Sequence, residues 1–287
     1  MNIFKVIIPG LMMVGAAVAA EVQPATTDTM TMQQDLRCRQ VLVNCVMNGV
    51  PMRMMIDTGA TNTVLHTGSL AKLKNPRQMD TSNIQFSGNA KERPSVYLLN
   101  VNFADVRVKN HPIMVLNLDG ARSMMHEQID GILGMDLLGA MPFTMDIANG
   151  QMHWGLPAGE LRLVPLHGTR DAAGRLFMDI LCDGRKLNIL LDSGSSVTRM
   201  PAEAWPAGGA QTVGMSVSDV NEAADISVTV GKPGNVELAP GVSLQNVTPV
   251  FCGEGEPIIL GMDILSRVRL IHVPSSSYAP GYYFLAL

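Results

Sequence analysis

Two short segments place an aspartate between an apolar stretch and a glycine. They are Met55–Thr61 (MIDTGAT) and Leu190–Ser196 (LLDSGSS). An aspartate in this setting is expected at the end of a strand, inside a tight loop, where Gly59 and Gly194 permit a sharp turn and a close approach of other groups. Asp57 and Asp192 are therefore the first candidates for chemistry.

If the two loops meet, their carboxyl groups share one site. Like charges at such short range cannot both ionise easily, so the pair retains one proton. One carboxylate can then accept a proton from a water molecule while the other carboxyl donates its proton to a substrate carbonyl. This chemistry is hydrolysis by an activated water without a covalent enzyme intermediate, and its apparent pKa values belong to the pair.

The two aspartate segments belong to an internal repeat. A second motif also occurs twice, at Ile132–Leu138 (ILGMDLL) and Ile259–Leu265 (ILGMDIL), each time after its aspartate. A third pair, Asn48-Gly49 and Asp183-Gly184, favours tight hairpin turns, and each glycine lies 8 residues before its aspartate. Each half is therefore expected to begin with a hairpin that leads into an aspartate loop.

The elements around these motifs are predicted to be mostly strands. Short apolar or β-branched runs bounded by Gly, Asn or Pro occur at 41–43, 52–56, 95–103, 106–108, 176–181, 187–191 and 226–230. A short helix is predicted after each I-L-G-M-D motif, over 136–140 and 263–268. The predicted fold class is all-β, with two tandem lobes related by pseudo-twofold symmetry, and the family resemblance that these motifs carry implies that each lobe is a β-barrel.

The repeat and the composition also set the predicted domain boundaries. Residues 1–20 carry one positive charge, Lys5, then an apolar stretch and an A-x-A arrangement ending at Ala19, which is the layout of a secretory signal peptide. Residues 21–36 are polar and unpatterned, so a flexible lead-in is expected. The two lobes are placed at 37–158 and 159–287, with a Pro/Gly-containing connector at their junction.

Export predicts an oxidising compartment, with a bacterial periplasm as the prediction and secretion as the alternative. The four cysteines allow three pairings. Pairing within each half of the repeat favours disulfides between Cys38 and Cys45 and between Cys182 and Cys252.

Composition and spacing argue against several other classes of protein. The chain has 287 residues, 47% of them hydrophobic, which supports a packed core, and a net charge of −4, which is no footprint for nucleic acid. No apolar run reaches the roughly 20 residues that a membrane helix needs, so no span is expected after processing. No C-x-x-C or H-E-x-x-H motif occurs, and neither a metal nor a cofactor is expected.

With these motifs the sequence resembles the aspartic peptidases, in particular the retropepsin-like group. The D-T-G-A of residues 57–60 is similar to the retropepsin catalytic loop, and the D-S-G-S of 192–195 to the second-lobe loop of pepsin-type enzymes. The two I-L-G motifs resemble the family element that packs under the catalytic loop. The resemblance covers residues 40 to 272 and implies that both lobes have the retropepsin- or pepsin-like fold.

The resemblance also implies roles for individual residues. It assigns catalysis to Asp57 and Asp192, support of the loops to Thr58, Gly59, Ser193, Gly194 and Ser195, and substrate binding in a flap to Ser87 and Gly88. The hydroxyl groups of Thr58 and Ser193 are expected to form hydrogen bonds across the lobes and to hold the two loops rigid.

The two halves differ at one position beside the aspartates. Ala60 has no side-chain donor, whereas Ser195 at the matching position has a hydroxyl. Our hypothesis is that donors solvate Asp192 better, so that Asp57 carries the shared proton. Outside the site, His272 is expected on the surface.

The function predicted from these features is that of an exported, bilobal aspartic endopeptidase. A water activated between Asp57 and Asp192 would hydrolyse an extended peptide or protein substrate, and a monomer would be active because one chain carries both aspartates. One alternative is a non-catalytic protein that retains the lobes to bind a peptide or a partner. Another is a narrowly specific processing peptidase.

Overall fold

A computed structural model of the chain describes residues 29–31, 33–34, 39–82, 94–103, 106–155, 161–206, 210–218, 223–274 and 282–286. The predicted signal peptide (1–20), Cys38 and the predicted flap residues Ser87 and Gly88 lie outside the described residues.

Each half begins with the hairpin that the sequence predicts. In the first half β3 (Val41–Met47) pairs with β4 (Val50–Ile56), and in the second half β14 (Leu176–Cys182) pairs with β15 (Arg185–Leu191). The turn residues have positive φ in both hairpins, +46° and +80° at Asn48-Gly49 and +45° and +86° at Asp183-Gly184. Two successive residues with positive φ form a type I′ turn, whose twist matches that of two antiparallel strands. Asn, Asp and Gly are the residues that adopt positive φ most readily, which explains why they occur here.

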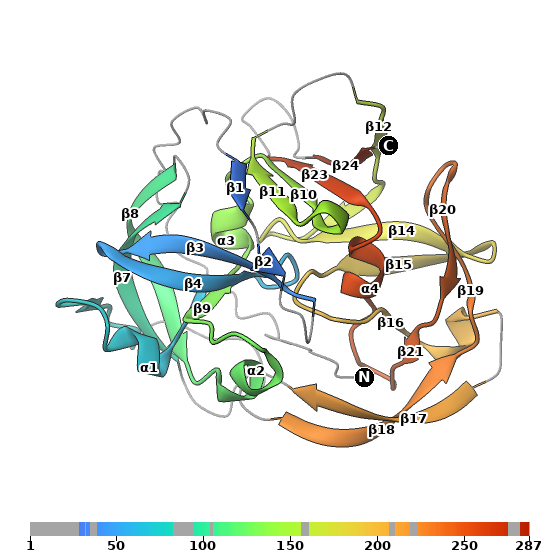
Figure 1. Cartoon of the computed structure of the whole chain (residues 1–287), viewed down its shortest axis with the longest axis horizontal. Helices are drawn as coiled ribbons and strands as arrows, with labels where there is room; N and C mark the ends of the chain where they lie inside the picture. Colours follow the sequence, from blue (N-terminus) through green and yellow to red (C-terminus); the bar gives the residue numbers. More distant parts are fainter. Residues whose placement is uncertain are drawn as a thin grey trace.

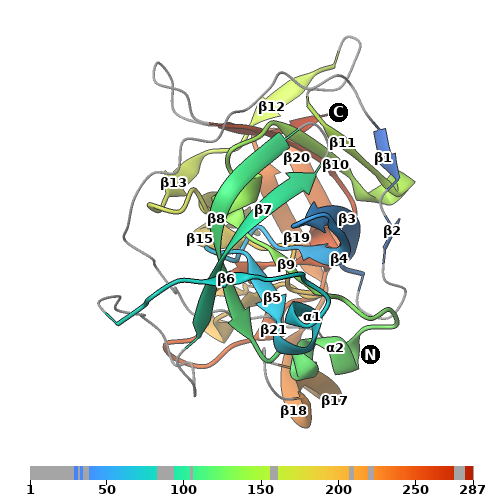
Figure 2. The same cartoon turned by 90° about the vertical axis from the view of Figure 1, so that its left-hand side faces the viewer.

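The first half builds an eight-stranded sheet of order β2-β3-β4-β9-β5-β8-β7-β6. Its further strands are β2 (Gln33–Gln34), β5 (Val64–His66), β6 (Arg77–Gln78), β7 (Ser95–Phe103), β8 (Val106–Leu116) and β9 (Gly131–Leu133). Figure 2 views the molecule from this side, with β7 and β8 in front.

The second half repeats this arrangement in a ten-stranded sheet, whose main path is β17-β18-β21-β16-β22-β15-β14-β19-β20. Its further strands are β13 (Gly168–Arg170), β16 (Arg199–Met200), β17 (Ala210–Ser218), β18 (Ala223–Gly231), β19 (Gly234–Ala239), β20 (Val242–Val247), β21 (Val250–Phe251) and β22 (Ile259–Leu260). In both halves the strand that leads into the aspartate pairs in parallel with the strand of the I-L-G motif, β4 with β9 and β15 with β22. The prediction of an all-β fold with a repeated topology is confirmed.

A third sheet joins the halves. Its order is β1-β11-β10-β23-β24-β12, and at its centre β10 of the first half pairs antiparallel with β23 of the second, Phe143 opposite His272. Figure 1 shows this sheet above the two halves, which lie to its left (blue to green) and right (yellow to red). The strands are β1 (Thr29–Thr31), β10 (Phe143–Asp146), β11 (Gln151–Trp154), β12 (Leu163–Pro165), β23 (Arg269–Val273) and β24 (Tyr282–Ala286).

Part of the predicted flexible lead-in is paired instead. Within residues 21–36, β1 pairs with β11 and β2 pairs with β3. These two short strands add backbone pairing to sheets that the rest of the chain provides.

The helices are few and short. The two predicted after the I-L-G-M-D motifs are α3 (Met135–Leu138) and α4 (Met262–Leu265), somewhat shorter than expected. The remaining helices described are α1 (Thr67–Leu70), α2 (Asp119–Met124) and the 3-10 turns η1 (Ile147–Asn149) and η2 (Ala202–Ala204). None of the helices in the described ranges has the length and apolar character required to cross a bilayer.

Two predictions outside the site are wrong. Cys182 is a buried free thiol, so the Cys182–Cys252 disulfide is not formed. His272 was expected on the surface but is 1% exposed, because β23 lies inside the shared sheet. Its ring stacks on Phe143 and contacts Tyr283, at centroid distances of 4.8 and 4.7 Å.

The burial of His272 predicts a loss of stability in acid. Burial lowers the pKa of His272 from 6.5 to about 4, and its Nδ1–H donates to the carbonyl of Met141 at 2.8 Å. His272 of the unfolded chain is thus protonated below about pH 6.5, whereas His272 of the folded chain is protonated only below about pH 4. The free energy of unfolding therefore falls as the pH drops from 6.5 to 4, by about 3 kcal/mol over the whole window.

His272→Asn keeps a donor for Met141 and removes the titration. Denaturant unfolding at several pH values between 4 and 7 should show a flatter profile for this variant than for the wild type. Parallel profiles for the two proteins would contradict the prediction.

Candidate active site

Each aspartate lies directly after a buried strand. Asp57 follows β4 and its N–H donates to Leu133 O of the first I-L-G motif at 3.0 Å; Asp192 follows β15 and its N–H donates to Leu260 O of the second, also at 3.0 Å. The parallel pairing of these strands therefore continues into the loops and fixes where each loop starts.

The two loops meet, and each glycine faces the aspartate of the other half. A Cβ atom on Gly59 would lie 2.4 Å from Cγ of Asp192, and a Cβ atom on Gly194 would lie 2.4 Å from Cγ of Asp57. Real Cβ atoms do not approach so closely, so these carboxyl groups occupy the space that side chains at the glycines would take. The structure thus brings Asp57 and Asp192 together from positions 135 residues apart.

The carboxyl pair is removed from solvent, at 1% and 4% exposure for Asp57 and Asp192. One oxygen of each group is held by its own loop. Oδ1 of Asp57 accepts the N–H groups of Gly59 (2.8 Å) and Ala60 (2.9 Å), and Oδ1 of Asp192 accepts the N–H of Gly194 (2.8 Å). These backbone hydrogen bonds orient the planes of both carboxyl groups.

The surroundings of the two carboxyl groups favour Asp57 as the carrier of the shared proton. Burial, then the charge of Asp192 and a hydrogen bond with it, raises the pKa of Asp57 well above its usual range. Burial also raises the pKa of Asp192, but the hydrogen bond from Asp57 lowers it. The buried Oδ2 of Asp57 accepts no hydrogen bond from the described residues, and a proton on this atom, donated to Asp192, satisfies it.

Thr58 and Ser193 lock the loops to each other. The Thr58 hydroxyl donates to Leu191 O (3.0 Å) and accepts the N–H of Ser193 (3.0 Å). In the mirror arrangement the Ser193 hydroxyl donates to Ile56 O (2.9 Å) and accepts the N–H of Thr58 (3.1 Å). All four bonds are buried and join the halves, so a displacement of one loop must move the other.

A second layer under the loops is also duplicated. The hydroxyl of Thr63 donates to Asp136 (2.7 Å) and accepts the N–H of Gly134 (3.2 Å). The hydroxyl of Thr198 does the same with Asp263 (2.8 Å) and Gly261 (3.1 Å). Neither threonine is among the residues predicted from the sequence, although both occur six residues after their aspartates.

Two further residues that are not predicted from the sequence contact the loops from the opposite half. Gln40 donates through Nε2 to Gly194 O (3.0 Å), and Arg175 donates through Nη1 to Gly59 O (3.2 Å). Both precede their aspartate by 17 residues, at the start of the repeated hairpin. This matched spacing was the signal that could have found them.

The reason given for the site's asymmetry is wrong. The Ser195 hydroxyl donates to Val197 O at 2.9 Å rather than to Asp192, because the loop curls back on itself. The backbone N–H of Ser195 does lower the pKa of Asp192, but Ala60 supplies an equivalent N–H to Asp57. A difference between the aspartates must therefore come from elsewhere.

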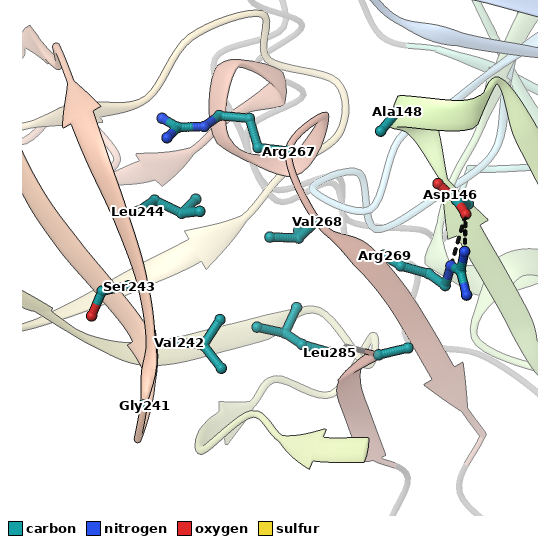
Figure 3. A pocket seen from close by; sticks show the side chains of 11 residues that line it. Asp146, Ala148, Gly241, Val242, Ser243, Leu244, Arg267, Val268, Arg269 and Leu285 are labelled. Carbon is teal, nitrogen blue, oxygen red and sulfur yellow. Dashed lines mark hydrogen bonds and ion pairs between the residues drawn. The ribbon is translucent and has the colours of Figure 1, made fainter. Parts of the chain in front are cut away.

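A cavity of about 450 Å³ lies away from these loops, between the β19–β20 hairpin and β23 (Figure 3). Its charged side chains are engaged within the protein, Arg269 with Asp146 at 2.6 Å and Arg267 with Gln245 O at 2.7 Å. Across the described ranges, no group of three or more His, Cys, Asp or Glu side chains is arranged to hold a metal ion.

A comparison with known protein families finds a match in the first half of the chain, in a region that includes the Asp57 loop. Residues 43–137, from β3 to α3, match the family model described as aspartyl protease. No curated protein matches the chain. Residues 43–137 are therefore similar to the retropepsin-like aspartyl proteases, and the second half repeats the sheet topology of this region.

Proposed function

We propose that the protein is an aspartic endopeptidase that activates one water molecule between Asp57 and Asp192. The observation that carries the proposal is the buried contact of these two carboxyl groups, one from each half. Each carboxyl group lies against a glycine of the opposite loop, where a residue with a Cβ atom would not fit. The family match, which includes Asp57, supports proteolysis in general.

The protonation of the pair sets the direction of the reaction. The Asp192 carboxylate accepts a proton from water while the water oxygen attacks the peptide carbonyl carbon, and Asp57 gives its proton to the carbonyl oxygen. The resulting gem-diol collapses when Asp192 passes its proton to the amide nitrogen and Asp57 takes back a hydroxyl proton. The C–N bond then breaks, and the pair is left with one proton, as it began.

The substrate proposed is an extended peptide bound between the halves by strand-like pairing. A single chain supplies both carboxyl groups and the bonds that lock them, so a monomer is proposed to be active. The signal-peptide pattern of residues 1–20 supports export, with the periplasm as the proposed location.

The proposal is tested with a broad peptide panel incubated with the protein between pH 3 and 8, with and without a statine-type inhibitor. Cleavage that the inhibitor suppresses is the expected result, because its hydroxyl group mimics the gem-diol between the carboxyl groups. Peptides that bind without being cut at any pH would overturn the endopeptidase and favour a peptide-binding protein.

A further inference from the structure

Gln40 and Arg175 occupy the same place in the two halves. Each lies 17 residues before its aspartate, and each crosses to the other half to donate to the glycine carbonyl of the opposite catalytic loop. The repeat therefore places a neutral amide on one loop and a guanidinium on the other. This is a charge difference between two sites that are otherwise closely alike.

The Arg175 cation is held in place. Its Nε donates to Oδ2 of Asp171 at 2.6 Å, while Oδ1 of Asp171 accepts the backbone N–H groups of Ala173 and Arg175. The guanidinium also lies 5.6 Å from the centroid of the Phe177 ring. With 16% of the side chain exposed, water screens this charge only partly.

Its amide counterpart is held as firmly but brings no charge. Gln40 is fully buried, and its Oε1 accepts the hydroxyl of Ser196 at 3.4 Å. The two residues thus make the same mechanical contact and differ in their electrostatic effect.

The position of the glycines decides which aspartate each residue influences. Arg175 donates a hydrogen bond to the carbonyl of Gly59, and the Asp192 carboxyl group packs against this same glycine. Gly194, to which Gln40 is bonded, is the residue against which the Asp57 carboxyl packs. The cation therefore lies on the side of Asp192.

We propose that Arg175 is a positioning residue that keeps Asp192 ionised and the shared proton on Asp57, and so assigns the base and acid roles of the pair. The catalytic consequence rests on the function proposed above, but the placement of the proton does not.

The ionisation of the pair agrees with this reading. Burial raises the pKa of Asp192, and the charge of Arg175 lowers it, as the hydrogen bonds to this carboxyl group do. Burial and the charge of Asp192 both raise the pKa of Asp57. In the described ranges, the charged side chain that acts on Asp192 is Arg175, and Arg175 is itself paired with Asp171 at 2.6 Å.

The test is a titration of the aspartate carboxyl carbons by ¹³C NMR in the full-length protein, with Asp57→Asn and Asp192→Asn for assignment. Arg175→Gln places a neutral amide at both positions, which removes the cation beside Asp192, and should raise the pKa of Asp192 by about one unit. Arg175→Lys keeps the charge and should stay near the wild type. The exchange Gln40→Arg with Arg175→Gln should move the proton, so that Asp57 becomes the more acidic group.

Unchanged titrations of Asp57 and Asp192 in Arg175→Gln and in the exchange variant would overturn the inference. An equal shift in Arg175→Gln and Arg175→Lys would also overturn it, because the contact rather than the charge would then matter. The titration needs no substrate, so failure to find cleavage would count against the proposed function alone. If cleavage is found, the acidic limb of kcat/KM should move upward in Arg175→Gln and not in Arg175→Lys.

Discussion

Asp57→Asn is expected to lower kcat for peptide cleavage by about three orders of magnitude or more, and Asp192→Asn to do the same. An amide at position 57 has no proton to give to the substrate carbonyl, and an amide at position 192 cannot accept one from water; loss of either transfer removes acid–base catalysis from the reaction. The measurement is kcat against the best substrate from the peptide panel, across the full pH range.

Folding should survive both substitutions. Asn has the shape of Asp, its Oδ1 can accept the loop N–H groups that hold the carboxyl groups, and its amide can donate to the remaining carboxylate. Replacement of one buried ionisable carboxyl group by a neutral amide should leave the free energy of unfolding at pH 7 unchanged or higher.

Asp183→Asn is the matched control. Asp183 lies in a hairpin turn with φ +45°, and Asn48 already occupies the same turn position in the first half with φ +46°. This variant should keep wild-type kcat. Substantial cleavage by both single variants of the pair would show that the water is activated elsewhere.

The parts of the fold that the sequence predicts best are those set by local chemistry. Asn48-Gly49 and Asp183-Gly184 predict the hairpins because few other residue pairs tolerate two positive φ angles in a row. The I-L-G glycines predict close packing under the loops, and a Cβ on Gly134 would indeed lie 2.5 Å from the Asn62 backbone. Such positions permit few alternatives.

The predictions that are wrong depended on contacts across the chain. Neither the distance from Cys182 to Cys252 nor the burial of His272 follows from spacing, because both depend on how strands distant in sequence pair. His272 is buried because β23 pairs with β10 of the other half, at Phe143.

Polar contacts between the halves were the hardest to foresee. A lone Gln40 or Arg175 before a strand has no local signature, since its partner is a carbonyl more than 100 residues away. The repeat could have paired the two positions, but only the structure shows that each one crosses to the opposite loop. The Ser195 hydroxyl is the opposite case. It lies three residues after Asp192 and could be expected to donate to that carboxyl group, but it donates to Val197 O of its own loop.

Gly59→Ala is expected to reduce kcat by about 100-fold or more with a smaller effect on folding. The new methyl carbon would lie 2.4 Å from Cγ and 2.6 and 2.7 Å from the two carboxyl oxygens of Asp192. Asp192 must then rotate away, lose its bond with the Gly194 N–H and part from Asp57. A displacement of about 1 Å in a reacting group is enough for such a loss in rate.

Gly194→Ala should behave in the same way, because its methyl carbon would lie 2.4 Å from both Cγ and Oδ2 of Asp57. Overpacking of this kind costs about 1–3 kcal/mol of stability, which thermal unfolding can measure separately from kcat. Gly214→Ala is the control, since a Cβ on Gly214 in β17 meets no atom within 4 Å, and it should keep both activity and stability. If Gly59→Ala and Gly194→Ala cut peptides as fast as Gly214→Ala, catalysis does not require the contact between the two carboxyl groups. That contact depends on the absence of a Cβ atom at both glycines.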